Sequence, residues 1–378
     1  MRIVVDETER LLASSVADMV KRRIEPRLAA CAPAEPVSKE TLAECFRDIA
    51  STGYFGVRVP EEMGGTGLGH TLGGTVTEAL PAFLAVACIA QEATVYRIAL
   101  GADEEVRAKY LPGLIAGELI GGSAISEPDV GSASNSVTST VSSDGDERVL
   151  NATKLWTSNG TVADVLVVLA KDERTGDPAR VLVDTRTTAV TAEEIPMSGL
   201  GRGHLCSVTV HATVPADHVL TSSATSERMT DSWTLNRVSM GLIACALAQA
   251  AIDYAISYAQ TREQFGRPIG RFQLVQGLIA DAASSVAAAR LLCYRALSEM
   301  EQGRSTVLSS SMAKLFATET ALQAILKAQQ VAGTYGVSTE LPFDQWLRDA
   351  RMLTFPDGTS QIQQLIIGRE LLGLSAFV

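Results

Sequence analysis

Asp357 lies in the segment FPDGTSQ, just before an apolar stretch with helical spacing. A carboxylate at that place has two interpretations. It is a turn residue favoured by the positive end of the following helix, or it is a general base, a role that carboxylates take when their surroundings adjust their pKa. The choice depends on whether other segments supply partners for such a base.

Two segments in the middle of the chain combine hydroxyl groups with an aromatic ring. AISEPDVGS contains Ser126 and Ser132, and small hydroxyls in a glycine-containing loop offer donors to a polar ring edge or a phosphate. KLWTSNG contains Trp156 and Ser158, and an aromatic plane beside a hydroxyl suits a flat heteroaromatic ligand. Each segment alone is more often an ordinary loop or strand end.

Two later segments break long helical patterns. TREQFGRPIGRFQ concentrates Arg262, Arg267 and Arg271 in an otherwise acidic chain, and arginine is well suited to phosphate. QQVAGTYG places Gln330 and Gly333 at a helix end, where glycine is an ordinary cap. A solvated interhelical loop explains the first segment as well as a phosphate site does.

Composition excludes several classes of function. The 378 residues carry a formal net charge of −11 and show no basic stripe with interleaved aromatics, so we expect no nucleic-acid partner. GGTGLG follows no strand and lacks the Lys-Ser/Thr of a P-loop. The four histidines show no metal-ligand spacing, so no metal site is predicted.

Three other features of the sequence favour a cytoplasmic location. The N-terminus, MRIVVDETER, lacks the charged and apolar regions of a secretory signal. No uncharged apolar stretch reaches eighteen residues, so we expect no membrane span. None of the six cysteines forms a C-x-x-C pair, which favours reduced, buried thiols.

Periodicity divides the chain into helical, β and helical parts. Apolar residues at helical spacing predict helices over 6–31, 38–51, 71–95 and 103–117, with loop and turn at 53–69. Short β-branched segments then predict strands over 135–143, 148–156, 163–171, 179–185 and 206–214. Long helical patterns return from about residue 232 and favour an antiparallel bundle. The fold class is mainly α with a β middle domain, divided as 1–120, 121–225 and 226–378.

The order and spacing of these motifs resemble the acyl-CoA dehydrogenase family over nearly the whole chain. The likeness is carried by GYFGVRVPEEMGGTGLG, YLPGLIAGELIGGSAISEPDVGS, KLWTSNG, TREQFGRPIGRFQLVQ and LRDARMLTFPDGTSQIQQLIIGRELL. The resemblance implies an N-terminal helical domain, a small β-barrel domain and a C-terminal four-helix bundle. It also implies FAD as cofactor, an acyl-CoA substrate, a homotetramer or dimer, and an electron-transfer flavoprotein as acceptor. The departures from the family described below add an acyl carrier protein as an alternative carrier of the acyl group.

The resemblance also assigns roles to individual residues. It places the flavin against Ser126, Trp156 and Ser158, and the acyl thioester near Ser132 and Arg237. It implies that further cofactor contacts, some of them to the FAD of a partner subunit, come from Arg262, Phe265, Gln273, Gln330, Gly333, Thr359 and Gln361.

Position 357 departs from the family. The resemblance implies that a carboxylate removes the α proton of the acyl thioester while hydride leaves to flavin N5. Family members normally have Glu before Gly-Thr, and a subset keeps it in a Leu-Glu-Arg segment of the first bundle helix. This chain has Asp357 at the first position and Asn236 at the second, so Asp357 is the remaining carboxylate at a known base position.

Three explanations of this departure stay open. The pocket is rebuilt around a shorter arm, a different proton such as a γ proton is removed, or the chain is a flavin-dependent monooxygenase or oxidase. An inert flavin- or acyl-binding homologue is a further alternative. The family's Gly-Gly and Gly-Ser-Asp are replaced at Thr334 and Ala133, which favours a specialised, biosynthetic role.

Overall fold

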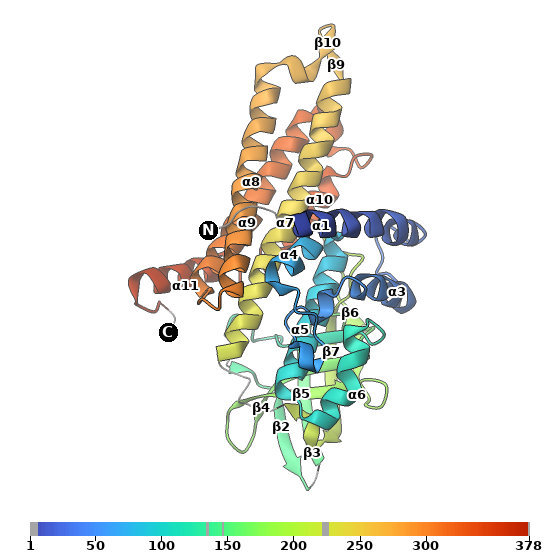
Figure 1. Cartoon of the computed structure of the whole chain (residues 1–378), viewed down its shortest axis with the longest axis vertical. Coiled ribbons are helices and arrows are strands. Elements are labelled where there is room, and N and C mark those ends of the chain that lie inside the picture. Colours follow the sequence, from blue (N-terminus) through green and yellow to red (C-terminus); the bar gives the residue numbers. More distant parts are fainter. Residues whose placement is uncertain (1–6, 134–135, 146, 221–226, 377–378) are drawn as a thin grey trace.

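We describe the fold from a computed structural model of the chain, which describes residues 7–133, 136–145, 147–220 and 227–376. The first residue of the strand predicted over 135–143 and the predicted boundary at 225 lie outside these ranges. Figure 1 shows a helical bundle that extends upward from a β domain, with the N-terminal helices packed beside their junction.

The N-terminal part is helical, as expected. Helix α1 (Glu7–Met19) continues through a π-helical stretch, η1 (Val20–Ile24), into α2 (Glu25–Ala29). Helix α3 (Lys39–Ala50) begins after Ser38, whose side chain accepts a hydrogen bond from the Thr41 amide. The predicted loop at 53–69 contains the short 3-10 turns η2 (Tyr54–Gly56) and η3 (Glu61–Met63). Helix α6 (Glu104–Ile115) completes this part.

The single helix predicted over 71–95 is wrong. The structure has two helices there, α4 (Gly69–Ala79) and α5 (Ala82–Gly101), separated at Leu80 and Pro81. Leu80 is extended, as expected for a residue that precedes proline, and Pro81 caps α5 without needing a backbone donor. Helix α5 is buried on nearly all sides, and it packs against both the β domain and the bundle.

The middle part is one eight-stranded sheet. Its strands are β1 (Gly121–Ala124), β2 (Thr140–Asp144), β3 (Glu147–Ser158), β4 (Val165–Asp172), β5 (Pro178–Asp184), β6 (Thr191–Glu194), β7 (Leu205–Pro215) and β8 (Val219–Leu220). They follow the order β6-β7-β3-β1-β4-β5-β8, and β2 pairs with β3 and β4. Five strands were predicted. Strands β1, β6 and β8 were missed because they are short, and β2 covers only the second half of its predicted range.

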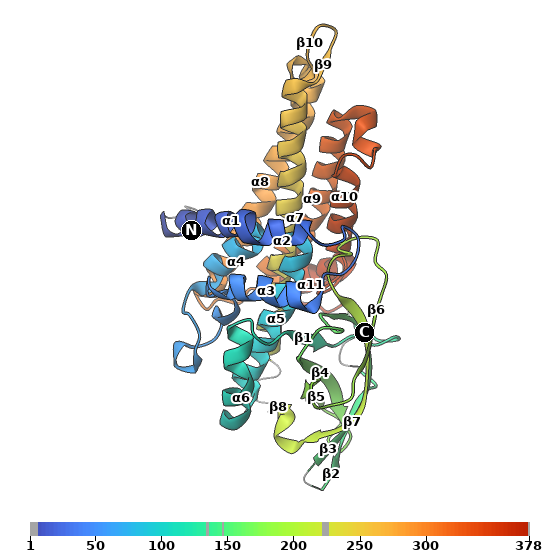
Figure 2. The same ribbon diagram turned by 90° about the vertical axis from the view of Figure 1, so that its right-hand side faces the viewer.

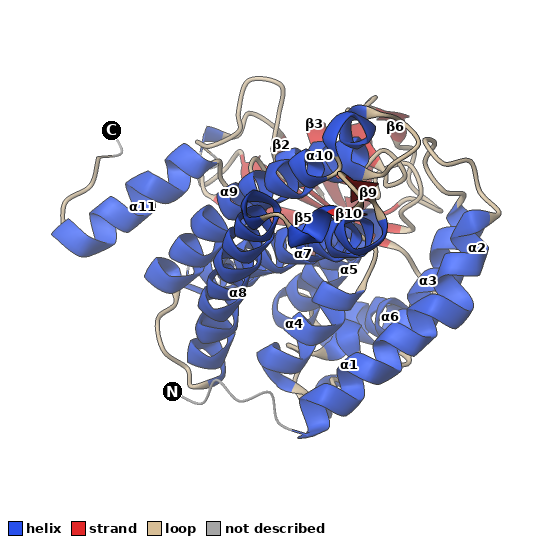
Figure 3. Ribbon diagram, turned by 90° about the horizontal axis from the view of Figure 1, so that it is seen from above, coloured by secondary structure: helices blue, strands red, loops and turns tan. Residues whose placement is uncertain are grey.

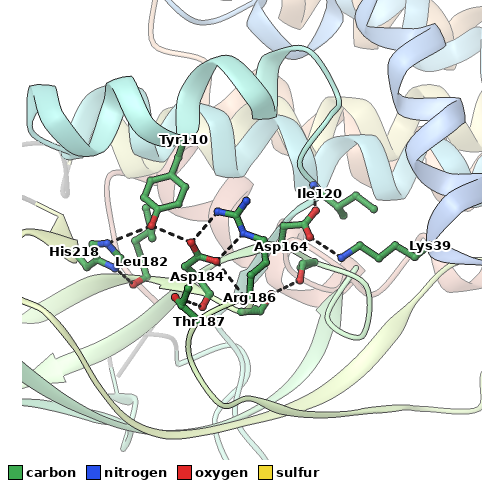
Figure 4. Close-up of polar contacts among 11 residues, drawn as sticks. Lys39, Tyr110, Ile120, Asp164, Leu182, Asp184, Arg186, Thr187 and His218 are labelled. Atoms are coloured by element: carbon green, nitrogen blue, oxygen red, sulfur yellow. Dashed lines mark hydrogen bonds and ion pairs between the residues drawn. The ribbon is translucent and has the colours of Figure 1, made fainter.

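Polar contacts fix the sheet to the N-terminal helices. Lys39 on α3 pairs with Asp164 at 2.6 Å, and the Tyr110 hydroxyl on α6 donates to Asp184 at 3.2 Å. Arg186 donates to the same Asp184 carboxylate. These residues form a line along the junction (Figure 4). The sheet therefore has a defined position relative to α3 and α6.

The C-terminal part is a bundle of long helices. It contains α7 (Glu227–Thr261), α8 (Gln273–Glu301), α9 (Val307–Val331), α10 (Phe343–Met352) and α11 (Ser360–Leu372). A small hairpin of β9 (Glu263–Gln264) and β10 (Arg267–Pro268) joins α7 to α8 at the end of the bundle far from the sheet (Figure 2). Helix α11 projects to one side when the molecule is viewed from above (Figure 3).

In the part of the chain that the structure describes, three helices are long and apolar enough to cross a membrane by length and composition. They are α5, the part of α7 from Trp233 to Thr261, and α8, and 78%, 67% and 22% of their most apolar windows are buried inside the protein. The expectation that no segment spans a membrane is therefore not confirmed. Helix α8 differs from the other two because most of its surface is uncovered in the single chain.

Candidate active site

Asp357 occupies a turn between α10 and α11 and has an unusual backbone conformation. Its φ is 54°, in the left-handed region that few residues other than glycine adopt. Aspartate tolerates this region better than most residues because its short side chain bonds locally. Strained conformations of this kind persist where the surroundings hold them, and they cluster at functional sites.

Buried side chains hold this turn from several directions. Lys314 on α9 donates to the carbonyl oxygen of Thr354 at 3.3 Å and to that of Gly358. Gln363 on α11 donates to the carbonyl oxygens of Asp357 and Gly358 at 3.0 and 2.9 Å. The Lys314 and Gln363 side chains are 1% and 0% exposed. The position of the carboxylate is therefore fixed by groups that do not touch it.

Helix α7 supplies the contacts on the other side of Asp357. The Asn236 amide donates to Oδ1 of Asp357 at 3.3 Å, and Arg237 Nε donates to the Asp357 carbonyl oxygen at the same distance. Burial raises the pKa of Asp357, while the charge of Lys314, the Asn236 bond and the charges of Arg237 and Arg97 oppose the rise. A raised pKa makes the carboxylate a stronger base.

Strands β1 and β3 position the residues predicted to contact a flavin. Ser158 on β3 lies opposite Ser123 on β1, and the Leu155 amide donates to the Ser126 carbonyl oxygen at 2.9 Å. The pairing of β3 with β7 shifts register between Lys154 and Thr157. Trp156, inside this irregularity, has a φ of 61° and is 52% exposed. The large ring of Trp156 is therefore exposed at an irregularity of the strand, where a bulge can redirect a side chain.

A buried ion pair joins these two segments. Glu127 accepts from Lys154 Nζ at 2.7 Å, and the two side chains are 2% and 0% exposed. Glu127 also accepts from the Thr138 amide and hydroxyl and from the Ser139 amide. The pair lies next to Ser126 in sequence on one side and two residues before Trp156 on the other, so it fixes the distance between them.

The start of α11 provides a further hydroxyl. Thr359 caps this helix, and its side chain accepts from the Ile362 amide at 3.4 Å. Gln361 is exposed on the first turn. Ser132 lies in an exposed stretch with Gly131, beyond the loop that Glu127 holds. The structure thus places Thr359 and Arg237 beside Asp357, whereas no hydrogen bond among the described residues joins Ser132 to that turn.

The remaining predicted residues lie at the far end of the bundle. Arg262 and Phe265 belong to the β9–β10 hairpin, and Gln273 begins α8. Gln330 and Gly333 lie at the end of α9, and the Arg262 guanidinium is 5.9 Å from the ring of neighbouring Tyr335. Phe265 is 91% exposed. These residues lie toward the end of the bundle that carries β9 and β10, and no hydrogen bond or ion pair of the described residues joins them to Asp357 (Figure 1).

Several residues of the site were missed by sequence reasoning. Lys314 and Gln363 bind the Asp357 turn, and Arg58, Glu92 and Arg97 form a charged group on and beside α5. A single charged residue inside an apolar helical pattern is the signal that points to them, because such a residue is buried only when it is paired.

The fold and the sequence together define the class of protein. Family models for the acyl-CoA dehydrogenase N-terminal, middle and C-terminal domains match residues 6–118, 122–211 and 227–372. The chain belongs to the acyl-CoA dehydrogenase family. It is an oxidoreductase that acts on the CH–CH group of an acyl thioester.

Several individual proteins of known name are similar to this chain over most of its length. Glutaryl-CoA dehydrogenase of Desulfococcus multivorans is 33% identical over 88% of this chain and 88% of its own. The solved structure of a glutaryl-coenzyme A dehydrogenase–glutaryl-CoA complex has a TM-score of 0.91 at 30% identity and covers 99% of this chain and 97% of its own. The prolyl acyl carrier protein oxidase AnaB has a TM-score of 0.88 at 25% identity over 98% and 100%.

FAD is the cofactor of this family, and the residues present fit it. A glutaryl-CoA dehydrogenase of Mycobacterium smegmatis, similar in fold with a TM-score of 0.88 at 24% identity, is solved with FADH2. In this chain the outward-turned Trp156 offers a ring face, and Ser126, Ser158 and Thr359 offer hydroxyl groups. The Thr157 hydroxyl is buried without a hydrogen-bond partner among the described residues, as expected of a group beside a polar ligand.

Proposed function

We propose that Asp357 is the base of an acyl-thioester dehydrogenation. The observation that supports this role is the environment of its carboxylate: a hydrogen bond from Asn236, a backbone fixed by Lys314 and Gln363, and partial burial that raises its pKa. Asp357 would accept the α proton of the acyl group on a carboxylate oxygen. FAD, when bound, supplies the acceptor for the hydride that leaves the β carbon, and the product is the enoyl thioester.

The surrounding cations would stabilise charge as the α proton leaves. Arg237 and Lys314 are buried and lie close enough to act on the Asp357 charge. We propose that the same charges also act on the enolate that forms next to Asp357, since a fixed positive charge stabilises an enolate more in a water-poor site than in solvent. Both residues are already held by backbone carbonyls, so little reorganisation is needed.

The experiment that tests the base is an anaerobic titration of the flavin absorbance with a panel of acyl-CoA and acyl-carrier-protein esters. The parent protein should lose its oxidised flavin band with at least one ester. Asp357→Asn should bind FAD and the same ester but bleach roughly 10²- to 10⁴-fold more slowly, the usual contribution of a general base. An Asn variant that reacts as fast as the parent would show that another group removes the proton.

A carrier-protein substrate and a biosynthetic role are part of the proposal. Support comes from the similarity to a protein titled as a prolyl acyl carrier protein oxidase. Acylated carrier protein should then outcompete the matching CoA ester, and equal kcat/KM for the two would contradict it. The name oxidase also favours oxygen as an acceptor over an electron-transfer flavoprotein, and oxygen uptake during turnover separates the two.

We further propose a homo-oligomer in the cytoplasm. The exposed Phe265 and Leu274, the uncovered face of α8, and the group at Gln330 and Gly333 are all at one end of the bundle or along it, far from Asp357. A second copy that covers this surface would bring these residues to its neighbour's cofactor. The six cysteines are free, which agrees with a reducing compartment.

A further inference from the structure

Arg97 is a buried cation with unused hydrogen-bonding capacity. It lies on α5 and is 8% exposed. Its Nη1 donates to the Ser123 hydroxyl, while Nε is buried without a hydrogen-bond partner among the described residues. Ser123 lies opposite Ser158 in the pairing of β1 with β3. The guanidinium is therefore held at β1, opposite the residue of β3 that is predicted to contact the flavin.

The nearest carboxylate on α5 is already taken. Glu92 forms a two-bond ion pair with Arg58, and both side chains are 4% exposed. The Arg58 guanidinium also lies 4.1 Å from the centre of the Tyr96 ring, and its Nη1 has no partner in the described part of the chain. No ion pair of the described residues includes Arg97.

The charges around Arg97 leave an excess of positive charge. Burial, together with the charges of Arg180 and Arg58, lowers the pKa of Arg97 to about 9. The charges of Asp357 and Glu92 act on the pKa of Arg97 in the opposite direction. Arg237 and Lys314 act on the same Asp357. A buried excess of cations is costly unless an anion joins it.

We infer that Arg97 binds a carboxylate carried by the acyl group of the substrate. A guanidinium with a free edge matches a carboxylate in geometry and charge, whereas a hydrocarbon tail would leave Nε unpaired. The inference rests on the proposed function, because Asp357 marks the reacting end of the acyl group. It makes the substrate a dicarboxylic monothioester rather than a simple fatty acyl thioester, and it makes Arg97 the residue that determines this specificity.

The test compares acyl-CoA esters that differ only at the acyl terminus. Dissociation constants are measured by calorimetry on the holoenzyme for succinyl-CoA against butyryl-CoA and for glutaryl-CoA against valeryl-CoA. In at least one pair the parent should bind the acid about tenfold or more tightly, the range expected of a charge-assisted hydrogen bond. Arg97→Met should bring that ratio to within about twofold and leave the affinity for the hydrocarbon ester unchanged within about threefold.

A matched control and a second variant keep the outcome clear. Arg290 pairs with Glu78 on α4 and is not among the groups that act on Asp357, so Arg290→Met should keep the parent's ratio. Ser123→Ala removes the anchor of Arg97 without removing the charge, and should reduce the ratio even if Arg97→Met does not fold. Equal binding of acid and hydrocarbon by the parent in both pairs overturns the inference. So does an Arg97→Met protein that keeps the ratio, or one that loses FAD instead.

Flavin reduction distinguishes a failure of the Arg97 site from a failure of the proposed dehydrogenation by Asp357. Tight binding of the acid ester with no bleaching by any thioester would contradict the dehydrogenation by Asp357 and leave the Arg97 site supported. Bleaching by hydrocarbon esters without any preference for acids would contradict the Arg97 site and support the dehydrogenation.

Discussion

Asn236 donates its side-chain amide to Oδ1 of Asp357 over 3.3 Å, so helix α7 and the turn before α11 face each other at the proposed base. The resemblance to acyl-CoA dehydrogenases gives these as the two positions at which a catalytic Glu occurs. The structure brings them into contact in one chain, with the carboxylate at one and its amide counterpart at the other. Either position could therefore present a carboxylate to the same acyl group.

Moving the carboxylate should test this relationship directly. In Asp357→Asn, adding Asn236→Glu places a longer carboxylate on the facing helix, and we expect it to recover at least about tenfold of the lost flavin-reduction rate. The measurement is the anaerobic bleaching rate of the double variant against Asp357→Asn. Asn236→Gln in the same background is the control, because it lengthens the side chain without a charge. No gain over that control would mean that position 236 does not reach the α proton.

Lengthening the base in place should impair it if the pocket is built around Asp357. Asp357→Glu moves the carboxylate by about 1.5 Å, one carbon–carbon bond. A displacement of about 1 Å costs roughly 10²-fold when the reacting atoms are well aligned. We therefore expect Asp357→Glu to reduce flavin about 10²-fold more slowly at saturating ester. A faster Glu variant would show instead that the chain keeps the geometry of its Glu-bearing relatives.

Removing Lys314 should shift the pH dependence of flavin reduction. Burial raises the pKa of Asp357, and the Lys314 charge is the strongest influence that lowers it. The base works when ionised, so the rate rises with pH through the pKa of Asp357. In Lys314→Met this pKa should rise, and the acid limb of the profile should move to higher pH. The position of the limb decides the outcome, because loss of the Thr354 and Gly358 bonds lowers the maximal rate independently.

Lys314 should also make the stability of the folded protein depend on pH. Burial lowers the pKa of Lys314 to about 8 from 10.5, so between those values the unfolded chain binds more protons than the folded one. Stability contributed by this residue therefore rises with pH over that window, by on the order of 3 kcal/mol at most. Relative to Lys314→Met, the parent's melting temperature should rise between pH 8 and 10. A difference that is constant with pH would contradict the lowered pKa.

The exposed Phe265 of the β9–β10 hairpin allows a test of whether a second copy of the chain helps to hold FAD. Phe265→Ser should leave the melting temperature of FAD-free protein unchanged, because the side chain is 91% exposed in the single chain. If a neighbouring subunit covers it, the variant should release FAD at protein concentrations at which the parent retains it. Light scattering and the flavin-to-protein absorbance ratio measure both effects. Unchanged mass and flavin content would place the cofactor contact elsewhere.

Much of the fold was predictable because it repeats a pattern. The β-branched and apolar residues of β3, β4, β5 and β7 and the apolar spacing of the bundle helices each extend over many residues. The break between α4 and α5 was missed since the apolar pattern continues across Leu80 and Pro81. The strand β1 was missed because its sequence, GGSA, has no β-branched residue and acquires its conformation from β4 and α5.

The candidate site was predictable only where the family resemblance marks it. Asp357 and Trp156 lie in motifs that can be read locally. Lys314 and Gln363 come from helices 43 and 6 residues away from Asp357 in sequence, and their hydrogen bonds to the turn follow from packing alone. Glu92 is the carboxylate on α5 that could pair with Arg97, but it pairs with Arg58 instead. Nothing in the sequence near Arg97 indicates this pairing.

The buried pair of Glu127 and Lys154 constrains how this protein can change. Removing one partner leaves the other charge buried and unpaired, which typically costs about 3–5 kcal/mol of folding stability. Replacing both partners with apolar residues of similar size is often close to neutral. A change from the ion pair to two apolar residues through single substitutions therefore passes through a strongly destabilised protein. In a library that varies both positions, survivors should carry either the original pair or two simultaneous replacements, with single changes depleted, so the two sites behave as one heritable unit.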